Sequence, residues 1–283
     1  MTLVVIGPVT MDLIRIGDEE TSKVGGATYF QSFVFEKFHN DYLALVNCSD
    51  ESLVNDFPDR GKVRVIEKDD THFFINHYPD ANDLNVRNQL SNFARIPIYP
   101  DDLEDLLPDE IDGFVLNPLN RNDFPPETVE FLKTFNVPVF ISIQGFLRIP
   151  NDKVNDSYTI RLEDFDELSD IFGAKISVKT DAVFYGKKLV EAGAENVLVS
   201  MGGQGAVLIT ENEAYEMNAP AGTVVNTIGA GDSMVAGFLA AIHNGQDIVD
   251  ALHLAVCAGS ATAFCETLAE RDEIFRLLDM VIR

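Results

Sequence analysis

The chain alternates short runs of apolar residues with segments whose apolar residues recur at helical spacing. The first run, Leu3 to Ile6, is rich in β-branched residues and stops at Gly7, which predicts a short buried strand. Strands are predicted at residues 3–6, 42–46, 113–116, 137–143, 174–178 and 196–200, and helices at residues 27–38, 101–107, 128–134, 164–172 and 184–192. Alternating strands and helices form right-handed βαβ units with helices on both faces of a parallel sheet. The pattern therefore predicts an α/β fold with a doubly wound, mostly parallel sheet.

Two stretches interrupt this alternation. Residues 14–24 are polar, and residues 63–78 change side at every position. In the second stretch Val63 and Val65 are followed by Phe73, Ile75 and His77 on one side and by Phe74, Asn76 and Tyr78 on the other. A period of two is typical of antiparallel strands with one solvated face. We expect a small accessory sheet that acts as a lid; the alternative is a peripheral hairpin without a function.

The amino-acid composition, above all the net charge, limits the kinds of molecule that the protein can bind. The 283 residues include 46 acidic and 21 basic side chains, for a formal net charge of −25. Nucleic acids and anionic membranes attract basic patches, so we expect neither as a partner. The longest apolar run, residues 234–242, is well short of the about 20 residues of a membrane span. The chain start lacks signal-peptide features, and the three cysteines are widely spaced, so we expect a cytoplasmic protein.

The most informative segment is a glycine-rich turn, Asn226 to Ser233, followed by small and apolar residues. It predicts a helix entrance whose first N–H groups are unpaired and lie at the positive end of the helix dipole, which together favour an anion. Asp232 at this entrance has two interpretations. It is either an N-cap or a general base that takes a proton from an alcohol beside a bound phosphate. The chain has no Walker-type motif, which excludes classical P-loop chemistry.

Residues 226–238 resemble the C-terminal signature of the ribokinase-like carbohydrate kinases, usually Asp-Thr-x-Gly-Ala-Gly-Asp. Five segments earlier in the chain also resemble the family and occur in its order. They are Met1 to Asp12, Val24 to Ala27, Thr71 to Asn76, Gln144 to Arg148 (as in an archaeal and inositol-kinase-like branch) and Val199 to Gly205. The resemblance spans nearly the whole chain. It implies one ribokinase-like α/β domain over residues 1–283, with a β lid formed by roughly residues 13–25 and 62–95.

The resemblance also implies a function and a set of site residues. The function is ATP-dependent transfer of a phosphoryl group, assisted by Mg²⁺, to a hydroxyl of a small neutral polyol. The implied roles are general base for Asp232; anion hole for Gly229, Ala230 and Gly231; substrate binding for Asp12, Gly25, Gly26, Asn76 and Arg148; and nucleotide binding for Ser200, Gly202, Gly205 and Thr227.

Simpler interpretations of these residues stay open. Asp12 fits a solvated loop, the two glycines an ordinary turn, Asn76 the wet face of a strand, and Arg148 a surface ion pair. The sequence also departs from the family pattern. Asn226 replaces the usual Asp, and Ser177 to Thr180, followed by Asp181, replaces an Asn-x-x-Glu motif that organises magnesium, which leaves the metal ligands unknown.

Alternatives remain for the activity and the assembly. The same family includes nucleoside and inositol kinases, and a regulatory protein that binds sugar or nucleotide without turnover is a further hypothesis. The family's lids often pair across a dimer, which Phe73 and Ile75 would permit unless they close over their own chain. Because the chain is acidic, we expect a neutral acceptor and a strong dependence on a divalent cation.

Overall fold

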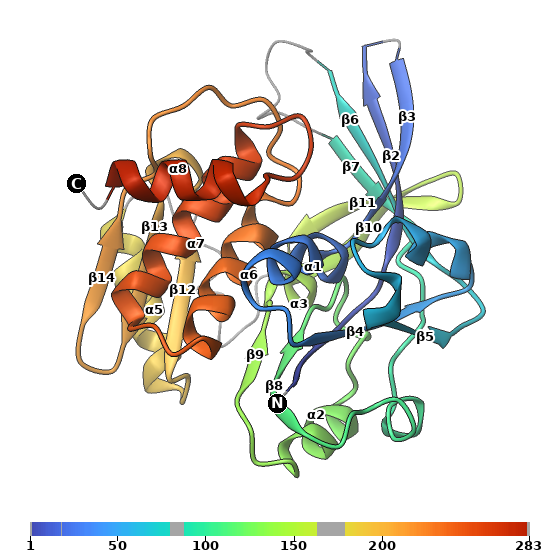
Figure 1. Cartoon of the computed structure of the whole chain (residues 1–283). Coiled ribbons are helices and arrows are strands. Elements are labelled where there is room, and N and C mark those ends of the chain that lie inside the picture. The colour runs from blue at the N-terminus through green and yellow to red at the C-terminus, as the bar shows by residue number, and fades with distance from the viewer. Residues whose placement is uncertain (1, 18, 80–87, 163–178, 282–283) are drawn as a thin grey trace. The chain divides into compact units, whose positions relative to one another are not determined.

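The computed structural model describes residues 2–17, 19–79, 88–162 and 179–281 (Figure 1). The chain divides into two compact units. The first contains residues 1–36 and 40–163, and the second contains residues 37–39 and 164–283. The predicted helix at 164–172 and strand at 174–178 lie outside the described residues. That the whole chain forms one domain remains a prediction.

The first unit contains a five-stranded sheet in the order β5-β4-β1-β8-β9, and all its neighbouring strands are parallel. The strands are β1 (Thr2–Ile6), β4 (Tyr42–Cys48), β5 (Val63–Glu67), β8 (Ile111–Leu116) and β9 (Val139–Ile141). The chain adds β4 and β5 on one side of β1, and later β8 and β9 on the other. Strand β1 is therefore the point at which the strand order reverses, where ligands of open α/β sheets bind.

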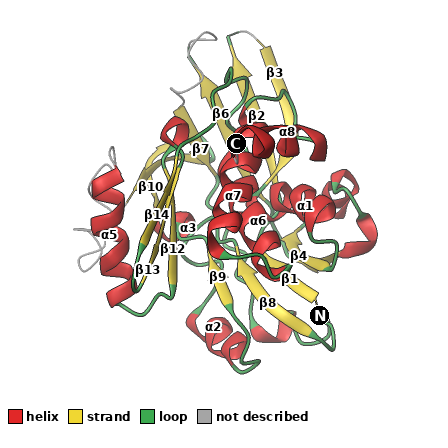
Figure 2. Ribbon diagram, turned by 60° about the vertical axis from the view of Figure 1, so that its left-hand side comes forward, coloured by secondary structure: helices red, strands yellow, loops and turns green. Residues whose placement is uncertain are grey.

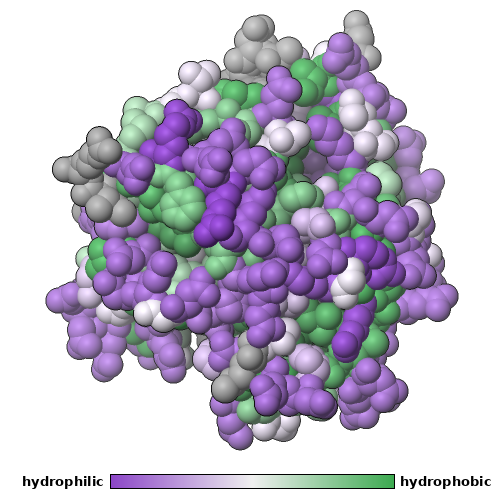
Figure 3. All heavy atoms as spheres, in the orientation of Figure 1, coloured by the Kyte–Doolittle hydropathy of each residue, from purple (hydrophilic) through white to green (hydrophobic). Residues whose placement is uncertain are grey.

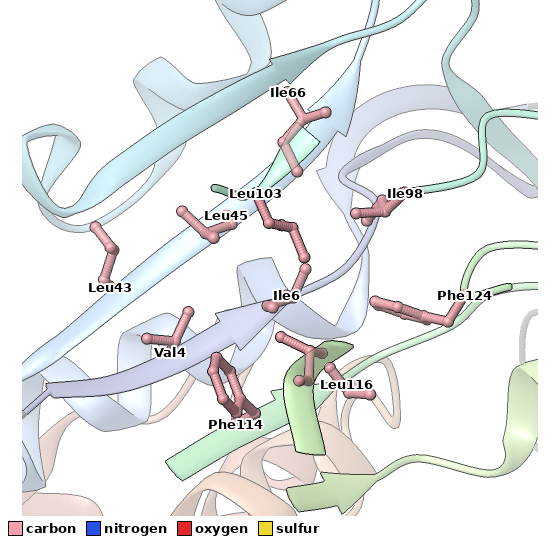
Figure 4. Close-up of a cluster of buried hydrophobic side chains, with 11 residues drawn as sticks. Val4, Ile6, Leu43, Leu45, Ile66, Ile98, Leu103, Phe114, Leu116 and Phe124 are labelled. Atoms are coloured by element: carbon pink, nitrogen blue, oxygen red, sulfur yellow. The ribbon is translucent and has the colours of Figure 1, made fainter. Parts of the chain in front are cut away.

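Apolar side chains cover both faces of this sheet. Helix α2 (Pro126–Lys133) packs on one face, in a core shown in Figure 4. That core consists of Val4, Ile6, Leu43, Leu45, Ile66, Ile98, Leu103, Phe114, Leu116, Phe124 and Leu132. Helix α1 (Ala27–Phe38) places Tyr29 against a second cluster that includes Ala44, Val46 and Val63. These two layers confirm the predicted doubly wound α/β class.

A second sheet in the first unit has six strands in the order β10-β11-β7-β6-β2-β3. Its strands are β2 (Thr10–Ile16), β3 (Glu19–Gly25), β6 (His72–Tyr78), β7 (Asn88–Ser91), β10 (Arg148–Val154) and β11 (Ser157–Leu162). Four of its pairings are antiparallel, but β2 and β6 pair in parallel. Figure 1 shows these two long strands side by side. We call this sheet the lid.

One part of the predicted lid is wrong. Residues Val63–Glu67 do not join the antiparallel sheet; they form β5, the edge strand of the parallel sheet. Val63 and Ile66 are buried there against β4 and its core. An edge strand with one partner shows the same side-to-side pattern as a lid strand, so the pattern alone does not select the sheet.

The second unit contains an antiparallel sheet of β12 (Asn196–Ser200), β13 (Ala206–Thr210) and β14 (Ala214–Met217). The predicted strand at 196–200 therefore exists but pairs antiparallel with β13. The connection to β13 is a single 3₁₀ turn, η4 (Gly202–Gln204), which is too short for a parallel crossover. Helix α5 (Lys179–Glu191) packs Ala182 on this sheet (Figure 2).

Helices α6 (Ala230–His243), α7 (Ile248–Ala263) and α8 (Arg271–Val281) complete the second unit. Helices α6 and α7 lie side by side in Figure 2. A Cβ atom at Gly237 would lie 3.0 Å from the Cβ of Ala258, so the two helices approach each other closely because position 237 is glycine.

Short elements connect the strands of the first unit. They are η1 (Glu51–Asp56), η2 (Arg60–Lys62), η3 (Pro100–Asp102) and α3 (Gln144–Leu147). The helix predicted at 101–107 is only the 3₁₀ turn η3 followed by turns. Of the helices that the structure describes, none has the length and apolar character needed to cross a membrane. The face in Figure 3 is mostly hydrophilic, in keeping with the charge of the chain.

Candidate functional site

The predicted acceptor-binding residues belong to the first unit. Strand β1 ends at Ile6, and after three intervening residues the chain enters the lid as β2. A Cβ atom at Gly7 would lie 2.5 Å from the carbonyl oxygen of Asn117, which follows β8, so the two chain segments pass in contact at the carboxyl ends of the strands. The segment after β1, the strand at which the strand order reverses, therefore leads directly to Asp12.

Asp12 is buried on β2, with 8% of its surface exposed. The hydroxyl of Thr10, two residues earlier on the same face, donates a 2.7 Å hydrogen bond to Oδ1 of Asp12. The burial excludes the interpretation of Asp12 as a solvated loop residue. Thr10 was not among the predicted site residues, although its i, i+2 spacing from Asp12 on a strand would have signalled it.

The two glycines at the end of β3, Gly25 and Gly26, are required by the space and the backbone conformation there. A Cβ atom at Gly25 would lie 2.7 Å from both Oδ2 of Asp12 and Oγ1 of Thr10. Gly26 has φ of +100° and approaches the carbonyl oxygen of Pro8, which a side chain would block. Gly25 and Gly26 thus make room for the Asp12 carboxylate and for the turn into α1.

The predicted lid residues Asn76 and Arg148 are both neighbours of Phe74, Asn76 by its position on the strand and Arg148 by contact with the ring. Phe74 pairs with Asp12 across β2 and β6, and the guanidinium of Arg148 lies 5.1 Å from the centre of the Phe74 ring. Asn76 follows Phe74 on the same face and is 2% exposed, while Arg148 is 8% exposed. The simpler interpretations, a wet-face Asn76 and a surface Arg148, are therefore wrong. We call Asp12, Phe74, Asn76 and Arg148 the lid cluster.

Asn76 has a partner that sequence reasoning missed. Gln89, directly opposite on β7, donates a 2.8 Å hydrogen bond from Nε2 to Oδ1 of Asn76. Directly paired residues of an antiparallel ladder point to the same face, so Gln89 belongs beside the lid cluster. No local signal marked Gln89, because its position opposite Asn76 depends on strand register.

The predicted anion hole lies in the second unit, at the start of α6. Gly229 is the N-cap residue and has φ of +77°, in the left-handed region. No side chain caps this end, whereas Asp247 caps α7 by accepting from the N–H groups of Val249 and Asp250. A Cβ atom at Gly231 would meet nothing described within 4 Å. The first turn of α6 thus has no side-chain cap and has open space beside Gly231, an arrangement that favours an anion, although the N–H of Ala230 donates to the carbonyl of Thr227.

Asp232 is the third residue inside α6 and is half-buried. Because the N-cap is Gly229, the interpretation of Asp232 as the N-cap is wrong. The next residue, Ser233, is fully buried and accepts a 3.0 Å hydrogen bond from the hydroxyl of Thr262 on α7. Ser233 also donates from its backbone to the carbonyl of Gly229. These bonds fix the helix turn that carries Asp232.

The predicted nucleotide-binding residues lie in the same unit. Ser200 ends β12 and is exposed, as are Gly202 in the following turn and Thr227 before α6. Gly205 closes that turn by accepting a 2.8 Å hydrogen bond from the N–H of Met201. Thr227 accepts from the N–H of Ala230 at 3.3 Å, so it supports the anion-hole turn through its backbone. Their contact with a nucleotide remains a prediction.

The described part of the chain does not contain a complete set of side-chain ligands for magnesium. Among those residues, no three His, Cys, Asp or Glu side chains come together as metal ligands. Asp181 lies in the first turn of α5, while Ser177 is outside the described residues. Asn226, the substitute for the family's Asp, uses Oδ1 to accept from the N–H of Ile228. These residues do not form a complete Mg²⁺ site.

Solved structures identify the fold. A pyrophosphate-dependent kinase in the ribokinase family matches with a TM-score of 0.78 and 19% identity over 96% of this chain and 99% of its own. Phosphofructokinase-2 from Escherichia coli matches with a TM-score of 0.71 and 18% identity over 99% of each chain. The protein therefore has the α/β fold of the ribokinase-like sugar kinases, as its motifs predict.

Sequence comparison gives a closer match for part of the chain than the solved structures do. Residues 160–272 match the family described as pfkB family carbohydrate kinase. The 1-phosphofructokinase of Bacillus subtilis is 50% identical over 115 residues, which are 41% of this chain and 38% of that protein. The chain thus spans about two fifths of the length of the curated relatives it matches. The family match includes the α6 entrance and Asp232, and begins after the lid cluster.

Proposed function

We propose that this protein is an ATP-dependent carbohydrate kinase that phosphorylates a hydroxyl of a small neutral polyol. The observation that carries the proposal is the start of α6. A left-handed Gly229 leaves the first helical turn without a side-chain cap, and Asp232 stands in that turn. This turn lies inside the stretch that matches the carbohydrate kinase family.

The proposed chemistry assigns one task to each part of this turn. Asp232 accepts the proton of the acceptor hydroxyl as its oxygen attacks the terminal phosphorus of ATP and the bond to the leaving ADP oxygen breaks. The N–H groups of Gly229 and Gly231, and that of Ala230 when it leaves its 3.3 Å hydrogen bond to Thr227, donate to the transferred phosphoryl oxygens, where negative charge is concentrated. Phosphoryl transfer depends mainly on such positioning and charge stabilisation, and this turn supplies both.

The lid cluster supports a polyol as the acceptor. Asp12 accepts hydrogen bonds from hydroxyls, Asn76 can both donate and accept, and Phe74 offers an apolar ring face to the carbon skeleton of a sugar. The Asp12 carboxylate disfavours a phosphorylated sugar through charge repulsion, whereas the Arg148 guanidinium of the same cluster would attract one, so fructose 1-phosphate is tested beside the neutral polyols. Myo-inositol and nucleosides remain alternatives within the same chemistry.

The proposal also specifies ATP as the phosphoryl donor and Mg²⁺ as the cation bound to its phosphates. The chain carries a net charge of −25, and its anion hole consists of uncharged N–H groups, so a divalent cation is needed to neutralise a polyphosphate. Activity should therefore disappear with excess chelator and return with added Mg²⁺. Full activity after chelation would contradict this part.

The test is a product assay with Asp232→Asn. ADP release and phosphorylated product are measured with ribose, fructose, fructose 1-phosphate, myo-inositol, adenosine, cytidine and 2-keto-3-deoxygluconate, with ATP or pyrophosphate as donor. We expect Asp232→Asn to lower turnover by about 10³-fold or more, with ATP binding and melting temperature nearly unchanged. Asp250→Asn, an acidic residue in the first turn of α7, is the matched control and should stay active.

Each other outcome has a meaning. Near-normal turnover of Asp232→Asn would overturn the assignment of the base. Binding of ATP and a polyol by the wild type without any product would favour the regulatory binding protein instead. A product only with pyrophosphate would change the donor and keep the class of reaction.

We also propose that two copies pair through the outer face of the lid, the face opposite to Asp12. On this face a hollow is lined by Met11, Leu13, Phe73 and Ile75, among other residues, and its lining is mainly apolar. The second copy is proposed as the cover, and light scattering should give about twice the mass of one chain. Leu13→Glu should give single chains, and a monomeric wild type would contradict pairing.

We further propose that the protein works in the cytoplasm, because its three free cysteines fit a reducing compartment.

A further inference from the structure

A pair of side-chain amides lies across two strands of the lid. Asn76 on β6 and Gln89 on β7 are direct partners in the antiparallel ladder, and Gln89 donates from Nε2 to Oδ1 of Asn76 at 2.8 Å. Asn76 is 2% exposed and Gln89 is partly buried. A polar pair this deep in a sheet face must be explained, because an apolar pair would cost less to bury.

The bond decides which end of the Asn76 amide a ligand meets. An amide has an oxygen that accepts and an NH₂ group that donates, and a half-turn of the terminal torsion exchanges them at little cost. Because Gln89 donates to Oδ1, that oxygen is directed toward β7. The NH₂ group of Asn76 is consequently held on the opposite side of the amide, as a fixed donor.

The fixed donor has a fixed acceptor as its neighbour. Asp12 pairs with Phe74, and Asn76 follows Phe74 by two residues, so Asp12 and Asn76 occupy diagonal positions on one face of the lid. Asp12 accepts from a hydroxyl, whereas an oriented Asn76 donates to one. One acceptor and one donor at fixed positions bind a diol in one orientation and disfavour the reversed one.

We propose that Gln89 is a positioning residue that, through Asn76, selects which hydroxyl of the polyol is phosphorylated. The proposal rests on the proposed kinase function and adds a specificity determinant to it. It requires no contact between Gln89 and the substrate, because Gln89 acts only by setting the orientation of the Asn76 amide.

The test compares two near-isosteric variants. Gln89→Met removes the donor, and Gln89→Glu replaces it with an acceptor that repels Oδ1 of Asn76. Asn88→Asp is the control, since Asn88 is the exposed neighbour on the same strand. With fructose and myo-inositol, we expect both Gln89 variants to raise acceptor KM about tenfold, the effect of one hydrogen bond, with donor KM unchanged. Product NMR should show a second hydroxyl phosphorylated.

A double-mutant cycle separates positioning from a structural role. If Gln89 acts through Asn76, Gln89→Met should have almost no effect on acceptor KM in an Asn76→Ala background. A purely structural residue would lower the melting temperature and affect both backgrounds equally. That result, or unchanged acceptor KM and product position in active Gln89 variants, overturns the proposal while the kinase function stands.

The failure of the kinase function has a different signature. In that case the wild type gives no product with any acceptor, and calorimetry with fructose and myo-inositol then measures the same variants. Polyol binding that weakens about tenfold in Gln89→Met supports the positioning role without catalysis. Binding that ignores Gln89, or no polyol binding by the wild type, overturns it.

Discussion

The hydroxyl of Thr10 donates to the carboxylate of Asp12 at 2.7 Å, and both side chains are buried on one face of the strand that enters the lid. The bond fixes the rotation of the carboxylate, so the directions in which Asp12 accepts hydrogen bonds are set by its own strand. In its proposed role in acceptor binding, Asp12 would therefore be oriented before the substrate arrives, which lowers the entropy cost of binding.

Thr10→Val should therefore weaken acceptor binding without unfolding the protein. Valine keeps the shape of threonine but removes the donor to Asp12, and a hydrogen bond to a charged group contributes about 1.5–3 kcal/mol. We expect acceptor KM to rise roughly ten- to a hundredfold while donor KM stays constant. Thr10→Ser keeps the hydroxyl and is the control; equal losses in both variants would show that the hydroxyl is not the cause.

Gly25→Ala tests the same carboxylate from the facing strand. The added Cβ would lie 2.7 Å from Oδ2 of Asp12 and from Oγ1 of Thr10, so both side chains must move. We expect a loss of about 1–3 kcal/mol in the free energy of unfolding and a larger relative loss of acceptor affinity. Calorimetry with the acceptor and chemical denaturation give the two values. Gly203→Ala, where no described atom lies within 4 Å of the added Cβ, is the control, and a Gly25→Ala variant with normal acceptor affinity would contradict the packing argument.

The sequence pattern predicted local elements well and long-range partners poorly. Helical spacing placed a helix at Ala27–Phe38, where the structure has α1, and the period of two separated buried Asn76 from the other face of its strand. The same period assigned Val63–Glu67 to the lid, because alternation does not show which strand is the neighbour. Gln89 was missed for the same reason, since its importance comes only from its register with Asn76.

The glycine turn of the second unit gives a prediction on the donor side. Gly229 has φ of +77°, a conformation that costs a residue with a Cβ about 1–2 kcal/mol. Gly229→Ala should lower stability by this amount and raise donor KM, because the first turn of α6 shifts, while acceptor binding stays constant. Gly229→Asn should lose less, since asparagine tolerates the left-handed region. Equal effects of Ala and Asn would show that the backbone conformation is not the cause.

The thiol of Cys265 gives a prediction about pH. Burial, and after it the hydrogen bond that Sγ donates to Oε1 of Glu273 at 3.2 Å, together raise the pKa of Cys265 to about 11. In the unfolded chain a thiol has a pKa of about 8.5. Because the folded pKa is the higher one, the stabilising effect is complete below pH about 8.5 and is lost as pH rises toward 11.

A thiol-reactive disulfide reagent checks this at pH 8. The native protein should react slowly, since only the thiolate attacks, and the unfolded protein should expose three reactive thiols. Glu273→Gln removes the negative charge beside Cys265, so its pKa should fall and its labelling, mapped by peptide mass, should accelerate several-fold. Cys48 and Cys257 are buried, with pKa values raised by burial to about 11 and about 12, and provide the internal control. Faster labelling of all three thiols in Glu273→Gln would indicate general loosening of the fold, whereas acceleration confined to Cys265 shows that the neighbouring carboxylate holds its proton.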